Sequence, residues 1–487
     1  PDDVLSRYTF VSLFPDTVYK NESGGDPEVI PTLKYEDFLK YHEEYYHPSN
    51  SYIYIYGDMD VNERLEYLDR EYLSDFDVSD VDIHANIERQ AAFDKPVYET
   101  KPYAITEDES LEDNTYLSYN AVIGTSVDAK LYLAFQILDY ALVMTPGAPV
   151  KQALLDAGIS TDVYSSYETS LYQPVYSIVA KNSNSKEQDR FVSVINDTLE
   201  KLVKDGINER TIEAGINYYE FKYREADYGP YPKGLMYYLT MMDSWLYDET
   251  KPFIHIEAGD TFDELKKNAR NGYFEKLIKE YLLDNNHKSI ISLVPEYGLE
   301  KEKEQKEADK LAEYKSTLTN DELEELVKKT KELKEYQDTP SSQEDLEKIP
   351  MLELSDIKRE PAKDYIDGIK IVHHNIFTNK IAYINMSFDT KCVPDELIPY
   401  MGLLGSTLSL MDTKNYTYPE LTNEININCG GLATGTALYS DKVDFSKNTI
   451  VYEVKSKALY EKVPFVLGMM EEIMYNTRFD DYKRLKE

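Results

Sequence analysis

Residues 22–60 read ESGGDPEVIPTLKYEDFLKYHEEYYHPSNSYIYIYGDMD and predict a turn, a helix, a loop and a strand in unbroken order. The turn is the SGGDP cluster, because glycine allows positive φ and proline fixes its own. Apolar and aromatic residues recur at helical spacing over 35–46, and Pro48 ends this helix by pushing its predecessor out of the α region. The apolar run 52–56 predicts a strand covered on both faces. Asp60 opens a D-x-x-E spacing, which predicts the cap of another helix.

This stretch resembles the end of the first domain in the presequence-protease branch of the pitrilysin/insulinase zinc peptidases. The resemblance rests on SGGDP, on IP-x-L-x-YE-x-F-x-x-x-H-x-x-YYHPSN and on a strand that ends in YGD. It continues in LVMTPGAPVKQALLDAGI (142–159), IPMLELSDIKREP (349–361) and HHNIFTNKIAYINMSFD (373–389), and so spans nearly the whole chain. It implies an α+β fold of repeated pitrilysin-like domains, each an antiparallel sheet covered by helices, joined by a helical hairpin.

The chemistry of that family requires an HxxEH motif. Two histidines on one helix face bind zinc, and the glutamate acts on the zinc-bound water. The motif is absent from this sequence, in which no two histidines are four residues apart. His42 and His47 are five apart, which is about 140° around a helix, so they do not share a face. The seven histidines are His42, His47, His84, His255, His287, His373 and His374.

We therefore assign no catalytic, cofactor-binding or metal-ligating residue to this chain. In the family, the HxxEH helix and a distal glutamate precede the segment that begins here at Pro1, so we expect the chain to start after them. A helix signature opens at Phe479 and is cut at Glu487, which indicates an internal part of a longer protein. The resemblance also implies a substrate-holding arginine and tyrosine beyond Glu487. We expect zinc in the parent protein and none in this chain.

Several residues that could carry chemistry have a structural interpretation that we favour. His373 and His374 are adjacent in a predicted strand, where neighbouring side chains face opposite ways. His42 is expected to be a half-buried helix residue. Cys392 and Cys429 are expected to be thiols of the core or of loops, since two cysteines are too few for a disulfide framework.

The chain divides into five segments. We expect residues 1–75 to be the C-terminal part of the first, catalytic domain, and 76–100 to be a linker. Residues 101–295 form a second pitrilysin-like domain, and 296–349 a helical hairpin. Residues 350–487 begin a third, truncated pitrilysin-like domain.

The second and third domains show the same order of elements. In the second domain the patterns predict a strand at 116–123, a helix at 131–144, a short helix through Leu155, a strand at 175–180 and a helix at 191–202. In the third domain they predict a strand at 381–388, a helix at 397–410, a turn at 430–431, a strand at 450–454 and a helix at 463–474. The repeated order suggests an ancient duplication and an α+β class.

The segment between these domains is rich in glutamate and lysine. Over 299–336 it carries two thin apolar stripes at helical spacing, and Thr319 with Glu322 has capping-box spacing. This pattern predicts two helices with a short connection. By resemblance, such a hairpin joins two halves that close around the substrate.

Charge and hydropathy limit the possible partners. The net charge of −37 argues against nucleic-acid binding, since phosphates would be repelled. No apolar run approaches the ~20 residues that span a bilayer, so we expect no membrane partner. These features indicate a soluble, intracellular chain of unspecified compartment.

Two functions follow as hypotheses. In the first, the parent is a zinc metalloendopeptidase that degrades unfolded peptides in a closed chamber, and this inactive chain supplies chamber wall, hinge and part of the first domain. Its partners would be peptide substrates and the remaining domains of the same protein. In the second, the parent is a catalytically inactive relative that binds peptides or acts as a scaffold subunit. A third option, an unrelated acidic interaction protein, is disfavoured by the density of motifs. The sequence upstream of Pro1 discriminates the first two.

Overall fold

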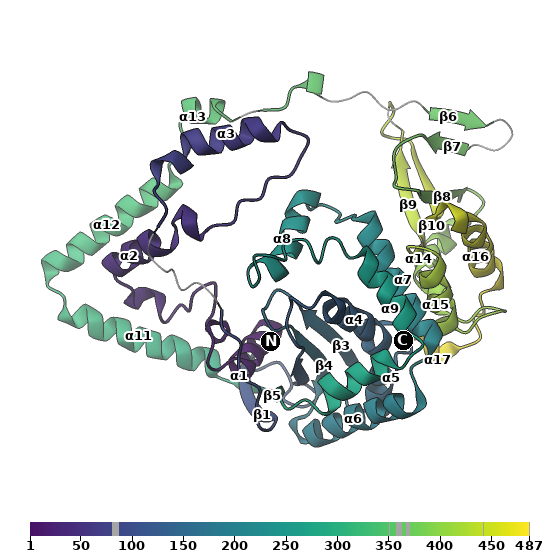
Figure 1. The fold of residues 1–487 in the computed structure, drawn as a ribbon, viewed down its shortest axis with the longest axis horizontal. Helices are drawn as coiled ribbons and strands as arrows, with labels where there is room; N and C mark the ends of the chain where they lie inside the picture. The colour runs from purple at the N-terminus through teal and green to yellow at the C-terminus, as the bar shows by residue number, and fades with distance from the viewer. Residues whose placement is uncertain (80–86, 350, 357–362, 367–370, 442, 487) are drawn as a thin grey trace. The chain divides into compact units, whose positions relative to one another are not determined.

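The computed structural model describes residues 1–79, 87–349, 351–356, 363–366, 371–441 and 443–486 (Figure 1). His84 and part of the predicted linker 76–100 lie outside the described residues. The chain forms two compact units. The first unit contains Pro1–Tyr103, Ser110–Pro295 and Asn379–Glu487, and the second contains Ala104–Glu109 and Glu296–Thr378.

A five-stranded sheet with the order β1-β5-β2-β4-β3 organises residues 97–297. Its strands are β1 (Val97–Ile105), β2 (Thr115–Val122), β3 (Asp162–Glu168), β4 (Val175–Ser183) and β5 (Lys288–Tyr297). The central strand β2 is antiparallel to both neighbours, and Tyr119 lies opposite Ile178 of β4 and Ile290 of β5. The predicted strands at 116–123 and 175–180 are confirmed.

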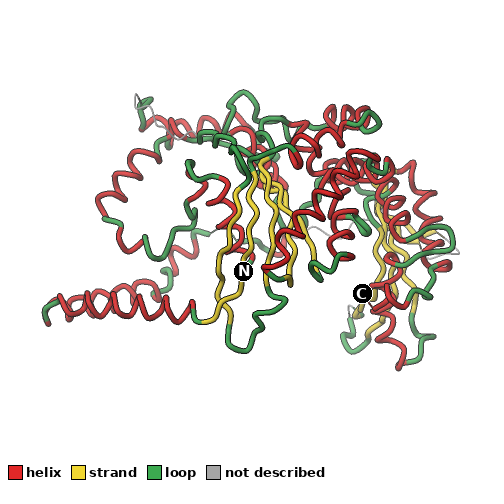
Figure 2. The backbone as a smooth tube through the Cα atoms, turned by 90° about the horizontal axis from the view of Figure 1, so that it is seen from below, coloured by secondary structure: helices red, strands yellow, loops and turns green. Residues whose placement is uncertain are grey.

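Helices pack on this sheet, as the red tubes along the yellow strands in Figure 2 show. They are α4 (Ala129–Asp139), the π-helix η5 (Tyr140–Met144), α5 (Pro149–Asp156), α6 (Gln188–Asp205), α7 (Glu209–Glu225), α9 (Gly259–Asn268), α10 (Tyr273–Leu277) and the π-helix η7 (Ile278–Leu283). Their apolar faces bury one continuous core with β2 and β4, in which Tyr119, Phe135, Tyr176 and Phe191 are almost fully enclosed. Helix α8 (Lys233–Trp245) lies between α7 and α9 in the chain and contributes no residue to this core. This core confirms the predicted helices at 131–144 and 191–202.

The stretch Ala129–Asp156 is the one helical segment of the described residues that is long and apolar enough to cross a membrane. It has 28 residues, and 72% of its apolar window is buried inside the fold. Packing against the sheet therefore accounts for its hydropathy.

Residues 379–486 form a second sheet with the order β8-β10-β9. Its strands are β8 (Ile381–Asp389), β9 (Leu432–Ser440) and β10 (Asn448–Leu459), and β10 is antiparallel to both neighbours. The helices are α14 (Ile398–Thr407), α15 (Tyr418–Asn428), α16 (Val463–Asn476) and α17 (Tyr482–Lys486). Leu421, Val454, Val466 and Ile473 meet in the core beneath them. The predicted strands and helices of this domain are confirmed, and α15 is an additional helix.

The N-terminal segment contains α1 (Asp2–Leu13), α2 (Tyr35–Tyr45) and α3 (Val61–Glu71). The predicted helix at 35–46 is confirmed as α2, which ends before a 3₁₀ turn at Pro48–Asn50. The predicted cap of α3 is also confirmed. The Asp60 carboxylate accepts hydrogen bonds from the backbone N–H groups of Asn62 and Glu63 at 2.9 and 3.1 Å.

The prediction of a strand at 52–56 covered on both faces is wrong. The segment forms neither a helix nor a strand, and the side chains of Ile53 and Tyr56 are 48% and 52% exposed. A strand needs a neighbour whose backbone groups pair with its own. None of the described strands supplies that neighbour.

In the second unit, α11 (Leu299–Thr317) and α12 (Asn320–Asp338) are joined by a two-residue turn, followed by α13 (Gln343–Glu347) and the hairpin of β6 (Lys363–Ile366) and β7 (Ile371–His374). The predicted helix pair and its capping box are confirmed: the Glu322 carboxylate accepts from the Thr319 N–H at 2.8 Å. The apolar stripes are exposed, with Leu311 at 60% and Leu333 at 55%.

Candidate functional site

The histidines of the described residues form no metal-binding group. The His42 ring is exposed and stacks on Tyr46 at 4.7 Å, so the expected half-buried position is wrong, because none of the described elements covers that face of α2. The His47 Nδ1 accepts from the Ser49 N–H at 3.1 Å and caps the following turn. His373 and His374 lie exposed in β7.

The two remaining histidines are buried and hold backbone carbonyls. The His255 Nε2 lies 2.8 Å from the Ser126 oxygen, and the His287 Nε2 lies 2.8 Å from the Leu13 oxygen at the end of α1. Burial lowers the pKa of His255 to about 4 and also lowers the pKa of His287. Both rings are therefore neutral donors at pH 7. In the part of the chain that the structure describes, no three histidine, cysteine or carboxylate side chains are placed to hold a metal ion.

The two cysteines lie in different environments. Cys392 is exposed and Cys429 is buried, and both are free thiols. Burial raises the pKa of the Cys429 thiol to about 11, so it is not a reactive thiolate.

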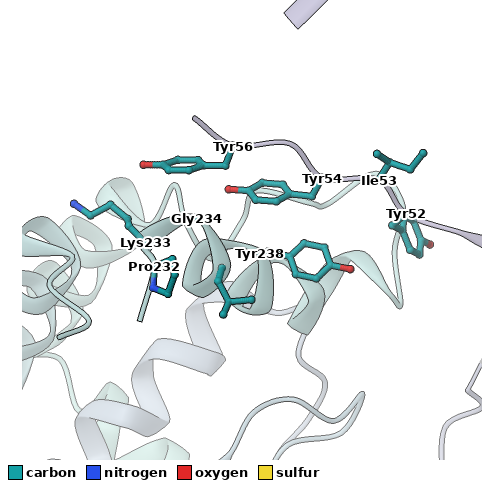
Figure 3. Close-up of a pocket in the computed structure, with 9 residues that line it drawn as sticks. Tyr52, Ile53, Tyr54, Tyr56, Pro232, Lys233, Gly234 and Tyr238 are labelled. Atoms are coloured by element: carbon teal, nitrogen blue, oxygen red, sulfur yellow. The ribbon is translucent and has the colours of Figure 1, made fainter. Parts of the chain in front are cut away.

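A concave surface lined by aromatic side chains lies between residues 52–56 and the start of α8 (Figure 3). We refer to it as the aromatic groove. It has a volume of about 660 Å³. Its lining residues are Tyr52, Ile53, Tyr54, Tyr56, Pro232, Lys233, Gly234, Leu235 and Tyr238.

Alternate side chains of the extended segment dock on α8 and the residues around it. Tyr52 packs on Trp245, Tyr54 on Tyr238 and Tyr56 on Tyr237, with ring centroids 4.6, 5.4 and 5.9 Å apart. This alternation is the period of two of an extended chain.

Gly234 permits the close approach of the two sides. A β-carbon at Gly234 would lie 2.5 Å from the Tyr56 Cδ1. The opposite face of the segment carries Ile53 and Ile55, which are 48% and 38% exposed. Within the described residues, the backbone groups of 52–56 make no backbone hydrogen bonds.

The other face of α8 is fixed to the domain core through Asp243. Its carboxylate accepts from the Tyr132 hydroxyl at 2.7 Å and from the Thr169 hydroxyl at 3.2 Å. The Tyr132 ring stacks on His255 at 3.9 Å. Burial raises the pKa of the Asp243 carboxyl to about 6, and the nearby charge of Glu168 acts in the same direction.

The groove offers aromatic faces and, within the described residues, a backbone segment without backbone hydrogen bonds. Its lining contains no histidine, cysteine or carboxylate side chain. The α8 side of the groove was not predicted from the sequence. The aromatic run YGPYPKGLMYY, with Pro232 before the helix, was the available signal.

Comparison with known proteins gives two family matches. Residues 32–219 match the Peptidase M16 inactive domain, and residues 293–487 match the domain associated with subfamily C of the M16 peptidases. Over its full length the chain is 32% identical to presequence protease 1, chloroplastic/mitochondrial, of Arabidopsis thaliana, of which it covers 46%. The chain belongs to the presequence-protease branch of the M16 (pitrilysin) peptidase family. This finding confirms the resemblance identified from the sequence.

The chain covers a similar share of other proteins that it matches. The chain is 41% identical to Protein HypA of Clostridium perfringens over its full length, covering 50% of that protein. It thus spans about half the length of the curated relatives it matches. Among solved structures, a peptidase M16 inactive domain from Pseudomonas fluorescens aligns with a TM-score of 0.47 and 14% identity, over 61% of this chain and 66% of that one.

Proposed function

We propose that this chain is the non-catalytic portion of a zinc-dependent oligopeptidase, which degrades unfolded peptides in a closed chamber. Membership of the M16 family supports the class of enzyme. The HxxEH motif, which would bind zinc, is not in this sequence. The zinc site would therefore belong to the part of the parent protein outside this chain.

The extended segment 52–56 is the observation that carries the proposal. Its three tyrosines dock on α8, and Ile53 and Ile55 are exposed. Within the described part of the chain its backbone makes no backbone hydrogen bond. In this chain the segment is not a strand. We infer that in the whole protein further strands of the catalytic domain would pair with its backbone and cover the isoleucines.

In this role the chain would make three contributions. Residues 101–295 and 350–487 would form chamber wall, α11 with α12 would form the hinge between halves, and residues 1–75 would complete the first domain. Peptide substrates and the other domains of the same protein are the proposed partners. The alternative, a catalytically inactive relative that binds peptides or acts as a scaffold, differs only in the sequence upstream of Pro1.

The test is expression of the whole gene product beside this chain. We expect the whole protein to contain an upstream HxxEH, to hold zinc at one equivalent, and to hydrolyse a fluorogenic peptide in a chelator-sensitive reaction. Replacing the glutamate of the motif with glutamine is the matched inactive control. A whole protein without the motif and without hydrolysis would establish the inactive alternative.

A further inference from the structure

Helix α7 ends in a carboxylate whose partners all come from residues 379–486. The Glu225 side chain is only 5% exposed. Its two oxygens lie 2.6 and 2.7 Å from the Lys457 Nζ, and the Tyr383 hydroxyl donates to it at 2.8 Å. Lys457 belongs to β10 and Tyr383 to β8, where they lie opposite one another.

The position of Glu225 is unfavourable for α7 itself. A carboxylate in the last turn of a helix faces the negative end of the helix dipole. The same turn carries Lys222 and Arg224, which are the residues that a helix C-terminus favours. A buried carboxylate at this place is stable only when a cation and hydrogen-bond donors are supplied to it.

The contact around Glu225 is close and specific. The Asn379 amide donates to the Arg224 carbonyl at 3.1 Å. The Phe221 ring lies over Gly430, where a β-carbon would be 2.0 Å from the ring. At the other end of α7, Arg210 forms an ion pair with Glu424 of α15.

We propose that Glu225 is a docking carboxylate, which holds the sheet of the third domain on the end of α7 through Lys457 and Tyr383. Removing the Lys457 charge leaves the buried Glu225 carboxylate without a cation, and removing the Glu225 charge leaves the half-buried Lys457 ammonium without its carboxylate. We therefore expect the contact to form or open as a unit. The proposal concerns the contact between α7 and residues 379–486 of this chain. It does not depend on whether the parent protein is a peptidase.

A distance measurement in the whole 487-residue chain tests the proposal. One spin label is placed on the exposed natural Cys392 of the third domain, and a second on Glu200→Cys, an exposed position of α6. Cys429 is buried and stays unlabelled. We expect one narrow distance distribution in the parent, and at least a doubled width or a second, longer distance in Lys457→Gln and Glu225→Gln.

Lys455→Gln is the matched control. Lys455 lies two residues away on the same strand, and its Nζ is 2.6 Å from Glu453 of that strand, so the third domain alone contains the pair. Its distribution should stay narrow. The reversed pair Glu225→Lys/Lys457→Glu should be narrower than either single reversal.

Circular dichroism and thermal melting establish that each variant is folded. Should Glu225→Gln not fold, Tyr383→Phe removes one hydrogen bond only and should broaden the distribution to a smaller extent. Distributions in Lys457→Gln and Tyr383→Phe that match those of the parent and of Lys455→Gln would overturn the proposal.

Discussion

At the scale of single residues, the Asp243 carboxyl makes the stability of the fold around α8 depend on pH. Its pKa is raised from 3.8 to about 6, chiefly by burial. The folded state therefore binds the proton more tightly than the unfolded state, and the free energy of unfolding falls as pH rises through this range. One pKa unit corresponds to about 1.36 kcal/mol, so the fall is about 3 kcal/mol at most.

We expect Asp243→Asn to remove this component. The free energy of unfolding of the parent and of the variant is measured in urea at pH 4 and at pH 7. The difference between the two proteins should change by up to about 3 kcal/mol from one pH to the other. Asp205→Asn, at an exposed position, is the control and should give a constant difference. A constant difference for Asp243→Asn as well would contradict the assignment.

At the scale of elements, helix α14 lies directly on strand β9 at Gly405. A β-carbon there would be 2.9 Å from the Gly435 Cα and 3.1 Å from the Thr434 oxygen, both of the backbone. Neither atom can move without shifting the strand. We expect Gly405→Ala to lower the free energy of unfolding of the third domain by about 1–3 kcal/mol, as overpacking does.

Gly402 in the same helix is the matched control. A β-carbon at Gly402 would have no neighbour within 4 Å. Gly402→Ala should therefore raise stability by up to about 1 kcal/mol through helix propensity alone. If the two substitutions change the midpoint of thermal unfolding equally, the close contact between α14 and β9 at Gly405 would be contradicted.

Local patterns predicted the elements whose partners lie within their own domain. The helix at 131–144 follows from apolar spacing, and the strands at 116–123 and 175–180 follow from their apolar runs. Helix α2 also follows from its spacing, although its residues are largely exposed in this chain. Helix α15 was not predicted because its pattern is broken by polar side chains. Two of these bond across domains: Asn423 donates to the Thr211 hydroxyl, and Asn426 to the Tyr140 hydroxyl.

Residues 52–56 show the opposite case. They have the composition of a buried strand, and the structure leaves them extended and open because a strand depends on a neighbour. The groove could not be predicted, since its two sides come from distant parts of the sequence and no motif links them. The same holds for the contact of Glu225 with Lys457, which only the packing of two domains creates.

At the scale of the whole molecule, we expect the isolated chain to hold no catalytic zinc and to cleave no peptide. The sequence has no HxxEH, and the described residues contain no cluster that would replace it. After dialysis against buffered zinc, metal analysis should give well under one equivalent, and a fluorogenic peptide should stay intact. Chelator-sensitive hydrolysis by the purified chain would refute this expectation.

The open isoleucines give a sharper prediction for the parent protein. Ile53 is 48% exposed in this chain, so Ile53→Asp should change the free energy of unfolding of the isolated chain by less than about 0.5 kcal/mol. In the whole protein the same aspartate would enter the proposed catalytic sheet, where a buried unpaired charge is strongly disfavoured. Peptidase activity should then fall at least tenfold.

Val78→Asp, at an 85% exposed position of the predicted linker, should leave activity unchanged. Equal activity of both variants would mean that segment 52–56 is not covered in the whole protein, and the proposed role of the segment would fail.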